Sequence, residues 1–265
     1  MELSKRLQAV ADLLDCHDRI ADIGCDHGFV SIYLIESKKA CKCLAMDVNK
    51  GPLERAKEHI TEKRLSTYIE TRLSDGAKEL QFIERKDGGT ELEVEAALIA
   101  GMGGRLMIQI LQDSLNKFQS MKEFVLQPQS EIAKVRQFVR TIGYHIERED
   151  MVLEDGKYYP MMKVVQGECE PNWSVNIPEG IQQKIESKEI SLSDISFMGD
   201  EYGEHLLKGK HPVLLQFLEK EKVLYQGILA DLEQRNSEKS EVRRKEISDK
   251  LKHIYLGLEW FENEM

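Results

Sequence analysis

The first 165 residues alternate short apolar runs with amphipathic stretches, and this alternation is the feature that most constrains the fold. Residues 19–23, 42–47, 68–73 and 96–100 are typical of strands. The last of these runs contains no polar residue, as expected for a strand buried on both faces of a sheet. Regular alternation of strands and helices predicts a mostly parallel sheet with helices on both faces.

The remaining elements of this region follow from periodicity and turn residues. We expect helices over 3–14, through 30–34, from Pro52 onward, over 106–115 and over 132–142, a strand over 123–128, and a polar loop over 84–93. The dipeptide Asp155-Gly156 separates two strand-like stretches, 145–154 and 157–165, which is a strong β-hairpin signal. This hairpin gives the sheet an antiparallel last strand.

The C-terminal part is expected to be helical. After a linker at 167–176, apolar residues recur at helical spacing from Leu214 to Leu232 and from Ile247 to Phe261. Two such helices, joined near Asn236, predict an antiparallel coiled-coil hairpin. We therefore expect an α/β domain over 1–167 and a helical domain over 168–265. The hairpin is either an inert extension or an arm for docking substrate or for assembly.

Charge is distributed unevenly along the chain. The 265 residues carry a net charge of −10, which counts against nucleic acid as a partner. However, residues 1–167 hold 24 Lys and Arg against 27 Asp and Glu, whereas residues 168–265 hold 13 against 20. Because binding depends on local patches, a basic face on the N-terminal part remains compatible with these numbers.

The expected compartment is the cytoplasm. No apolar run approaches the roughly 18 residues of a membrane span, and the first residues lack the apolar core of a signal peptide. For the same reason we expect no membrane partner. The five cysteines are odd in number and lack the spacing of a disulfide framework or of zinc ligands, so we expect reduced thiols and no metal site.

A glycine-containing loop follows the first expected strand, with the sequence Asp22-Ile23-Gly24-Cys25-Asp26-His27-Gly28. Glycine here lets the backbone turn and approach a ligand closely. The run lacks the third glycine of the dinucleotide fingerprint, and the carboxylate of Asp22 would repel a pyrophosphate. A carboxylate suits an ammonium or hydroxyl group, which favours a ligand such as S-adenosylmethionine over a nicotinamide cofactor. A purely structural turn is the alternative.

Acidic residues also end the next two expected strands. Asp47 lies 23 residues after Gly24, where a carboxylate binds ribose hydroxyls in doubly wound folds. Asp75-Gly76 ends the third strand, where an acidic side chain can accept a hydrogen bond from the exocyclic amine of adenine. Each residue alone could face solvent or form an ordinary turn. Their order at successive strand ends predicts a cofactor site.

A second glycine-rich loop, Gly101-Met102-Gly103-Gly104, follows the fourth expected strand. Three glycines in four residues allow the backbone to approach both cofactor and substrate, although a flexible turn would also use them. We expect Gly101 and Gly103 to lie beside the group that is transferred.

These motifs resemble those of class I S-adenosylmethionine-dependent methyltransferases. More closely, the chain is similar to bacterial tRNA adenine-N1 methyltransferases that modify adenine 22. The resemblance covers essentially the whole chain, with Gln129 standing where the family pattern suggests asparagine. It is carried by five motifs: Leu3-Ser4-x-Arg6-Leu7, Asp22-Ile23-Gly24-x-Asp26-His27-Gly28, Ile99-Ala100-Gly101-Met102-Gly103-Gly104, Leu126-Gln127-Pro128 and Glu154-Asp155-Gly156-Lys157-x-Tyr159.

The resemblance implies a Rossmann-like sheet and methyl transfer from S-adenosyl-L-methionine to N1 of adenine in tRNA. We expect the chain to be a monomer or weak homodimer. The Asn-Pro-Pro-Tyr motif of N6-adenine methyltransferases is absent, which agrees with a different target atom. Two alternatives stay open. The chain could methylate a small molecule or a protein, or it could be a non-catalytic module that binds S-adenosylmethionine and recruits partners.

The candidate site residues form three overlapping sets. Asp26 and His27 could instead cap a helix or make structural hydrogen bonds, and Gln127 could bind the Watson–Crick edge of adenine or support a strand end. We expect some of Lys38, Lys39, Lys42, Lys63, Arg64, Arg136 and Arg140 to bind phosphates. The cofactor set is Arg6, Asp22, Gly24, Cys25, Asp26, His27, Asp47, Asp75, Gly76, Gly101 and Met102; the catalytic set is Asp26, His27 and Gln127; the substrate set is Gly103, Gly104, Gln127 and Pro128.

Overall fold

The computed structural model describes residues 3–167, 177–233 and 238–262 of the chain. Its residues form two compact units, Met1–Cys169 and Glu170–Met265. Most of the expected linker, residues 168–176, and the expected junction of the helical hairpin, residues 234–237, lie outside the described residues.

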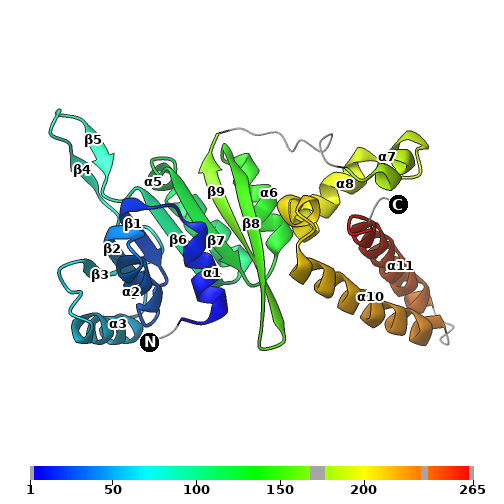
Figure 1. Ribbon diagram of the computed structural model, residues 1–265, viewed down its shortest axis with the longest axis horizontal. Helices are drawn as coiled ribbons and strands as arrows, with labels where there is room; N and C mark the ends of the chain where they lie inside the picture. Colours follow the sequence, from blue (N-terminus) through cyan, green and yellow to red (C-terminus); the bar gives the residue numbers. More distant parts are fainter. Residues whose placement is uncertain (1–2, 168–176, 234–237, 263–265) are drawn as a thin grey trace. The chain divides into compact units, whose positions relative to one another are not determined.

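The N-terminal unit is built on a seven-stranded sheet with the order β3-β2-β1-β6-β7-β9-β8 (Figure 1). The first five strands of this order pair in parallel, and β9 runs antiparallel to both β7 and β8. The expected Rossmann-like sheet with an antiparallel last strand is therefore confirmed. The strands are β1 (His17–Ile23), β2 (Ala40–Asp47), β3 (Ile69–Leu73), β6 (Ala96–Met102), β7 (Glu123–Pro128), β8 (Tyr144–Glu154) and β9 (Lys157–Gln166).

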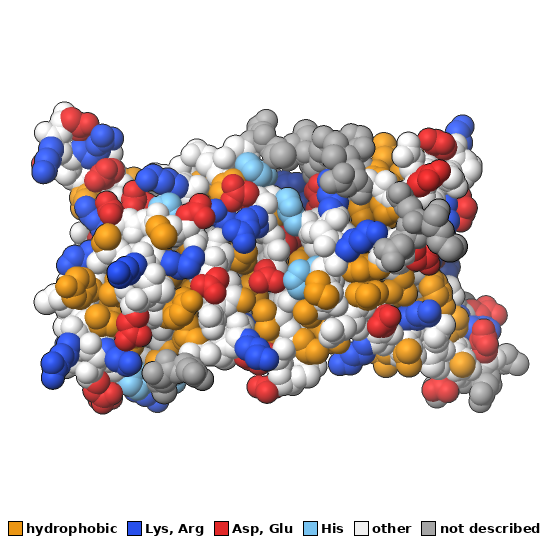
Figure 2. Space-filling model, in the orientation of Figure 1, with side chains coloured by type: hydrophobic (Ala, Val, Ile, Leu, Met, Phe, Trp, Pro, Cys, Tyr) orange, Lys and Arg blue, Asp and Glu red, His pale blue; other side chains and the backbone are white. Residues whose placement is uncertain are grey.

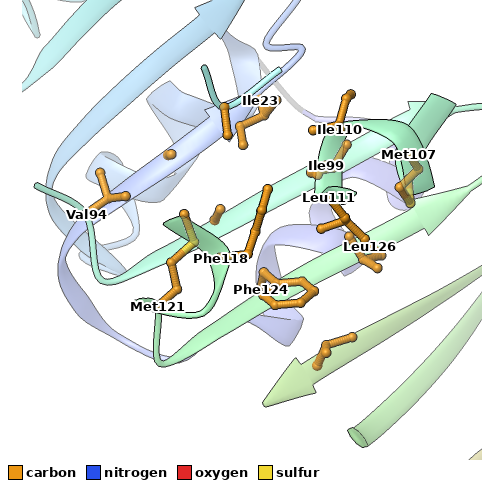
Figure 3. Close-up of a cluster of buried hydrophobic side chains, with 14 of the residues drawn as sticks. Ile23, Val94, Ile99, Met107, Ile110, Leu111, Phe118, Met121, Phe124 and Leu126 are labelled. Atoms are coloured by element: carbon orange, nitrogen blue, oxygen red, sulfur yellow. The ribbon is translucent and has the colours of Figure 1, made fainter. Parts of the chain in front are cut away.

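Six helices belong to this unit, and two buried hydrophobic clusters lie among the helices and strands. One cluster includes Met107, Phe118 and Phe124, as Figure 3 shows. The other includes Val10 and Leu34. Burial of both faces explains why the central strands are apolar without alternation. The helices are α1 (Lys5–Leu13), α2 (Phe29–Glu36), α3 (Lys50–Glu62), α4 (Gly104–Asp113), α5 (Leu115–Phe118) and α6 (Ile132–Thr141).

Two details differ from the sequence-based expectation. The polar stretch 84–93 is not only a loop, because β4 (Phe82–Glu84) pairs antiparallel with β5 (Thr90–Leu92) as a separate hairpin. Its turn uses Gly88 in the left-handed region, a role that glycine fills without strain. The expected helix over 106–115 starts earlier and is interrupted at Ser114, whose backbone leaves helical geometry.

The C-terminal unit is helical. Its last two helices pack side by side in opposite directions: Lys222 Nζ lies 5.4 Å from the centre of the Tyr255 ring, whereas the Tyr225 ring, further along the first of these helices, lies 4.5 Å from Nζ of Lys250, which comes earlier on the second. No helix among the described residues is long and apolar enough to cross a membrane. The elements are α7 (Glu179–Glu186), α8 (Leu192–Met198), a π-helical turn (Gly199–Gly203), α9 (Glu204–Lys208), α10 (Pro212–Glu233) and α11 (Glu238–Glu259).

Arg136 is one of the seven cations among which phosphate contacts were expected, but it is part of the core and cannot supply one. It lies on the inward face of α6 with Val135 and Val139 and is only 1% exposed. Its Nε atom lies 2.8 Å from Oε1 of Glu149, whose side chain is equally buried. A buried guanidinium requires such a partner, because an unpaired charge in an apolar interior is very costly.

Replacing Arg136 with alanine should lower the free energy of unfolding by about 3–5 kcal/mol, because Glu149 would keep a buried charge without its guanidinium partner. Urea denaturation measures the change. Lys134→Ala is the control, because it removes an exposed ion pair with Glu131 on the same helix and should cost less than about 1 kcal/mol. Equal losses in the two variants would contradict the assigned role.

Candidate active site

A cavity of about 500 Å³ opens at the carboxyl ends of β1, β2, β3 and β6. The strand register explains its position. Ile23 at the end of β1 lies beside Met46 of β2 and Ile99 of β6, so the loops that follow these strands meet at one edge of the sheet. The size lies within the usual range for small-molecule sites. The lining contains the whole expected cofactor set: Arg6, Asp22, Gly24, Cys25, Asp26, His27, Asp47, Asp75, Gly76, Gly101 and Met102.

The first glycine loop, residues 24–28, makes a sharp turn at the wall of this cavity. Gly24 has φ +81°, and a Cβ atom there would lie 2.1 Å from the Cε atom of Met102. The amides of Gly24 and Cys25 both donate to the carbonyl of Met46, at 2.8 and 2.9 Å. A side chain at Gly24 is therefore excluded both by backbone geometry and by the close approach of the second glycine loop.

Asp47 connects the end of β2 to this loop. Its Oδ1 accepts from the amide of Asn49 at 2.8 Å, and its Oδ2 accepts from the amide of Asp26 at 3.3 Å. Each carboxylate oxygen can accept a second hydrogen bond. Asp47 is thus held rigidly at the cavity wall and can still bind hydroxyl groups of a ligand.

Asp22 is the most buried carboxylate of the cavity, at 2% exposure. Its Oδ2 accepts from both the amide and the hydroxyl of Ser31, at 3.1 and 2.6 Å. Burial disfavours the charged form and raises the pKa of Asp22 to about 6, against the lowering effect of the Ser31 hydrogen bonds. A cationic ligand group would compensate this buried charge.

Gln127 lies behind the cavity wall and hydrogen-bonds to two residues that line the cavity. It is fully buried and is not part of the cavity lining. Its Oε1 accepts from Arg6 Nη1 at 2.9 Å and from the Gly101 amide at 3.1 Å, and its Nε2 donates to the Pro128 carbonyl. Both ends of the amide are engaged within the protein, and Gln127 thereby holds Arg6 and Gly101 at the cavity. The expected contact with a substrate base stays a prediction.

Arg6 is the cation that reaches the cavity from α1. Besides its bond to Gln127, its guanidinium carbon lies 5.2 Å from the centre of the Tyr159 ring. Its backbone amide donates to Glu154 at 3.5 Å. The Glu154–Tyr159 motif at the tip of the β8–β9 hairpin therefore contributes by positioning Arg6.

The other members of the expected substrate set also lie outside the cavity lining. Gly104 is buried, and a Cβ atom there would lie 2.4 Å from the carbonyl oxygen of Ser130. Gly103 caps α4, and Pro128 is buried at the end of β7. The reason is that β6 continues through Met102, so only Gly101 of the three glycines faces the cavity. Gly104 is needed for close packing, and the expected substrate contact of Gly103 stays a prediction.

Several lining residues were not expected from the sequence. Val48 and Leu106 are 58% and 52% exposed and line the cavity from the loop after β2 and from α4. An exposed hydrophobic residue has no sequence signature of its own, although Val48 directly follows Asp47. The remaining unexpected lining residues are Leu7, Ile23, Phe29, Val30, Asn49, Pro52, Ser74, Leu98, Ala100, Ile110 and Gln129.

The lining suits an organic cofactor that carries hydroxyl, amino and apolar groups. Carboxylates can bind the polar parts, while Val48 and Leu106 offer apolar contacts to a ring. Within the described parts of the chain, no cluster of three or more His, Cys, Asp or Glu side chains is arranged to hold a metal ion. The described cysteines, at 16, 25, 41 and 43, are free thiols, and Cys169 lies outside the described residues.

Comparisons with known proteins agree with this geometry. A family model described as a methyltransferase domain matches residues 3–162. The tRNA (adenine(22)-N(1))-methyltransferase of Bacillus subtilis is 29% identical over 252 residues, which are 95% of this chain and 94% of that protein.

Two solved structures share the fold over almost the full length. The crystal structure of the B. subtilis M1A22 tRNA methyltransferase TrmK has a TM-score of 0.73 and 27% identity, covering 97% of this chain and 99% of that one. A Streptococcus pneumoniae structure in complex with S-adenosyl-L-methionine has a TM-score of 0.74 and 25% identity, covering 97% and 100% of the two chains.

Replacing Asp22 with asparagine should remove a pH dependence of stability. The native pKa near 6 exceeds the ordinary value of 3.8, so the folded chain binds this proton more tightly and the free energy of unfolding falls as pH rises from about 4 to 6. At pH 7 the Asp22→Asn chain should be more stable by up to about 3 kcal/mol, and this gain should vanish near pH 4.

Urea denaturation of both chains between pH 4 and 7 measures this effect. Asp75→Asn is the control, because Asp75 is largely exposed and should give no such gain. Parallel stability curves for the wild-type chain and Asp22→Asn would show that Asp22 ionises without a burial cost.

Proposed function

The chain belongs to the methyltransferase-domain family, and from this premise we propose that it transfers a methyl group from S-adenosyl-L-methionine to N1 of adenine 22 in tRNA. The observation that carries the proposal is the meeting of Asp22, Gly24, Asp47 and Asp75 in one cavity, in chain order, at successive strand ends. The B. subtilis relative, which aligns with nearly the whole chain, supports the choice of tRNA and of the target atom. A tRNA substrate also favours the cytoplasm as the site of action.

The proposed cofactor contacts follow from the position of each group. Asp47 would accept hydrogen bonds from the ribose hydroxyls, as carboxylates do at this strand end in doubly wound folds. Asp75 would accept from the exocyclic amine of adenine, whose ring would lie between Val48 and Leu106. At the other end of the cavity, Asp22 would compensate the ammonium charge and Arg6 would pair with the carboxylate.

Methyl transfer to N1 of adenine requires mainly that the base be aligned with the methyl group. When bound, S-adenosyl-L-methionine supplies a methyl group activated by its sulfonium. N1 of adenine carries an in-plane lone pair, so no proton has to leave N1 before it attacks. The protein's task is to hold the base in line and exclude water, and positioning of this kind can lower a barrier substantially. Because pairing blocks N1, the adenine has to be unpaired or flipped toward the cavity.

Gly101, His27 and Asp26 are placed to guide the incoming base. Gly101 lines the cavity without a side chain, with Arg6 and Gln129 close to the place where a Cβ atom would stand. His27 is partly exposed, and its Nε2 lies 3.5 Å from Oδ1 of Asp26. We assign His27 and Asp26 the polar contacts of the base. Gln127, which is fully buried, acts by holding Gly101.

Incubation with unmodified tRNA and labelled S-adenosyl-L-methionine, followed by nucleoside analysis, tests the proposal. We expect 1-methyladenosine at position 22, and no label in a transcript whose adenine 22 is replaced by guanine. Label on another nucleoside, on a protein or on a small molecule would replace the proposed substrate. Cofactor binding without transfer to any acceptor would favour a non-catalytic binding module.

Asp47→Ala should weaken binding of S-adenosyl-L-methionine by about 1–3 kcal/mol, because a charged hydrogen-bond acceptor for the ribose is lost. Isothermal titration calorimetry measures the affinity. Asp87→Ala, an exposed change in the turn between β4 and β5, provides the control and should bind like the wild type. Unchanged affinity after Asp47→Ala would remove this residue from the site.

We further propose that the C-terminal unit contributes to tRNA docking. Its residues carry an excess of acidic side chains, so the contacts would come from shape or from a small basic cluster such as Arg243-Arg244-Lys245 on α11. On the face of the N-terminal unit in Figure 2, basic and acidic side chains are interspersed rather than separated. Neither unit thus presents a single large basic surface in this view.

A chain truncated after residue 169 should keep its affinity for S-adenosyl-L-methionine, because every described residue that lines the cavity belongs to the N-terminal unit. It should bind tRNA more weakly and turn over more slowly. Filter binding and single-turnover assays of both chains give the comparison. Equal tRNA affinity and equal turnover would make the helical unit a stabilising or assembly element.

A further inference from the structure

We propose that His59 of α3, which does not line the cofactor cavity, is a positioning residue that fixes the loop 24–28 for cofactor binding. The inference rests on the proposed use of S-adenosyl-L-methionine and concerns only how the loop is held. His59 is half-buried on the inner face of α3. Its sequence neighbourhood contains no motif that marks it as functional.

The central contact is a hydrogen bond from His59 to the backbone of the loop. Nδ1 of His59 lies 3.0 Å from the carbonyl oxygen of His27. A carbonyl oxygen only accepts, so Nδ1 carries the hydrogen and donates it. His27 itself lines the cavity. His59 therefore acts on a cavity residue through the backbone, and this bond uses neither nitrogen of the His27 ring.

The loop depends on contacts from outside itself. Three of its five residues, Gly24, Asp26 and Gly28, have positive φ angles of 81°, 48° and 72°. The angle at Asp26 is unfavourable for a residue with a side chain, and surrounding structure has to maintain it. The amide of Asp26 donates to Asp47, so a shift of the loop would also disturb the carboxylate proposed to bind the ribose.

Helix α3 supplies two adjacent contacts to this loop. Gly28 approaches the helix so closely that a Cβ atom on it would lie 3.0 Å from the Cβ of Ala56. His59 follows Ala56 by three residues, which places both on the same face of the helix. Ala56 thus sets the distance between helix and loop, and His59 adds a directional bond.

The ring of His59 also packs on a second cavity residue. Its centroid lies 4.8 Å from that of Phe29, with an interplanar angle of 27°, and Phe29 stacks in turn on His27 at 5.6 Å. Phe29 and His59 both border a separate cavity of about 280 Å³. Because this cavity lies beside the ring, close packing does not enclose His59, and the hydrogen bond and the stack determine its position.

Three substitutions separate the hydrogen bond from the stack. His59→Phe keeps a ring against Phe29 but loses the donor, and we expect the Kd for S-adenosyl-L-methionine to rise about five- to tenfold, the scale of one lost hydrogen bond. His59→Asn keeps an N–H donor at the same distance from the backbone and should stay within about twofold of the wild type. His59→Ala should resemble His59→Phe.

His145→Phe is the matched control. Nδ1 of His145 makes the same kind of bond, 3.0 Å from the carbonyl of Gly167, but His145 is not part of the cavity lining. Calorimetry gives the Kd for each chain, and thermal unfolding gives its Tm. We expect His145→Phe to leave the Kd unchanged whatever its Tm, because a loss of general stability does not by itself weaken the cofactor site.

Each outcome decides between the alternatives. Wild-type affinity in His59→Phe, a Kd in His59→Asn as high as in His59→Phe, or an equal rise in His145→Phe would overturn the positioning role. If His59→Phe fails to fold, His59→Ala and His59→Asn decide together: weaker binding in His59→Ala with wild-type affinity in His59→Asn supports the hydrogen bond, and equal affinities in the two chains contradict it. No binding by the wild-type chain would refute the proposed cofactor and would be distinct from all of these results.

Discussion

Parallel pairing on both sides of β1 is the constraint on which the rest of the structure depends. The strand order runs outward from β1 through β2 and β3 in one direction and through β6 and β7 in the other. Ligands of open α/β sheets bind where the order reverses, beyond the carboxyl ends of the strands. Asp22, Asp47 and Gly101 are distant in sequence, yet this reversal brings their loops to one cavity.

Features that depend on local chemistry could be predicted from the sequence. Strand and helix periods locate most elements, and Asp155-Gly156 identifies the β8–β9 hairpin because a tight turn needs those residues. The cofactor set follows from the same logic, since an acidic residue or glycine at the end of a parallel strand can only lie near the carboxyl edge of the sheet. Gly24 illustrates this, because its positive φ and the approach of Met102 both require glycine.

Features that depend on long-range contacts could not be predicted. Gln127 faces inward because Arg6, far away in sequence, occupies its carbonyl oxygen. Arg136 is a typical exposed helix cation by sequence, and only its burial opposite Glu149 shows otherwise. Gly104 belongs to the same glycine-rich run as Gly101, yet one packs against the Ser130 backbone and the other faces the cavity. Both positions hold glycine, and their different roles follow from the end of β6 at Met102, which lies between them.

The charge of the cavity adds a last constraint on its ligand. Four aspartates line it, Asp22, Asp26, Asp47 and Asp75, against the single guanidinium of Arg6 and the imidazole of His27. Such a surface repels a pyrophosphate and attracts a ligand of net positive charge. S-adenosyl-L-methionine carries an ammonium, a sulfonium and one carboxylate, and methyl transfer removes the sulfonium charge. The aspartates therefore bind the positively charged cofactor more strongly than its neutral, demethylated product. The same electrostatic attraction that holds the methyl donor thus weakens after transfer, which eases release of the product.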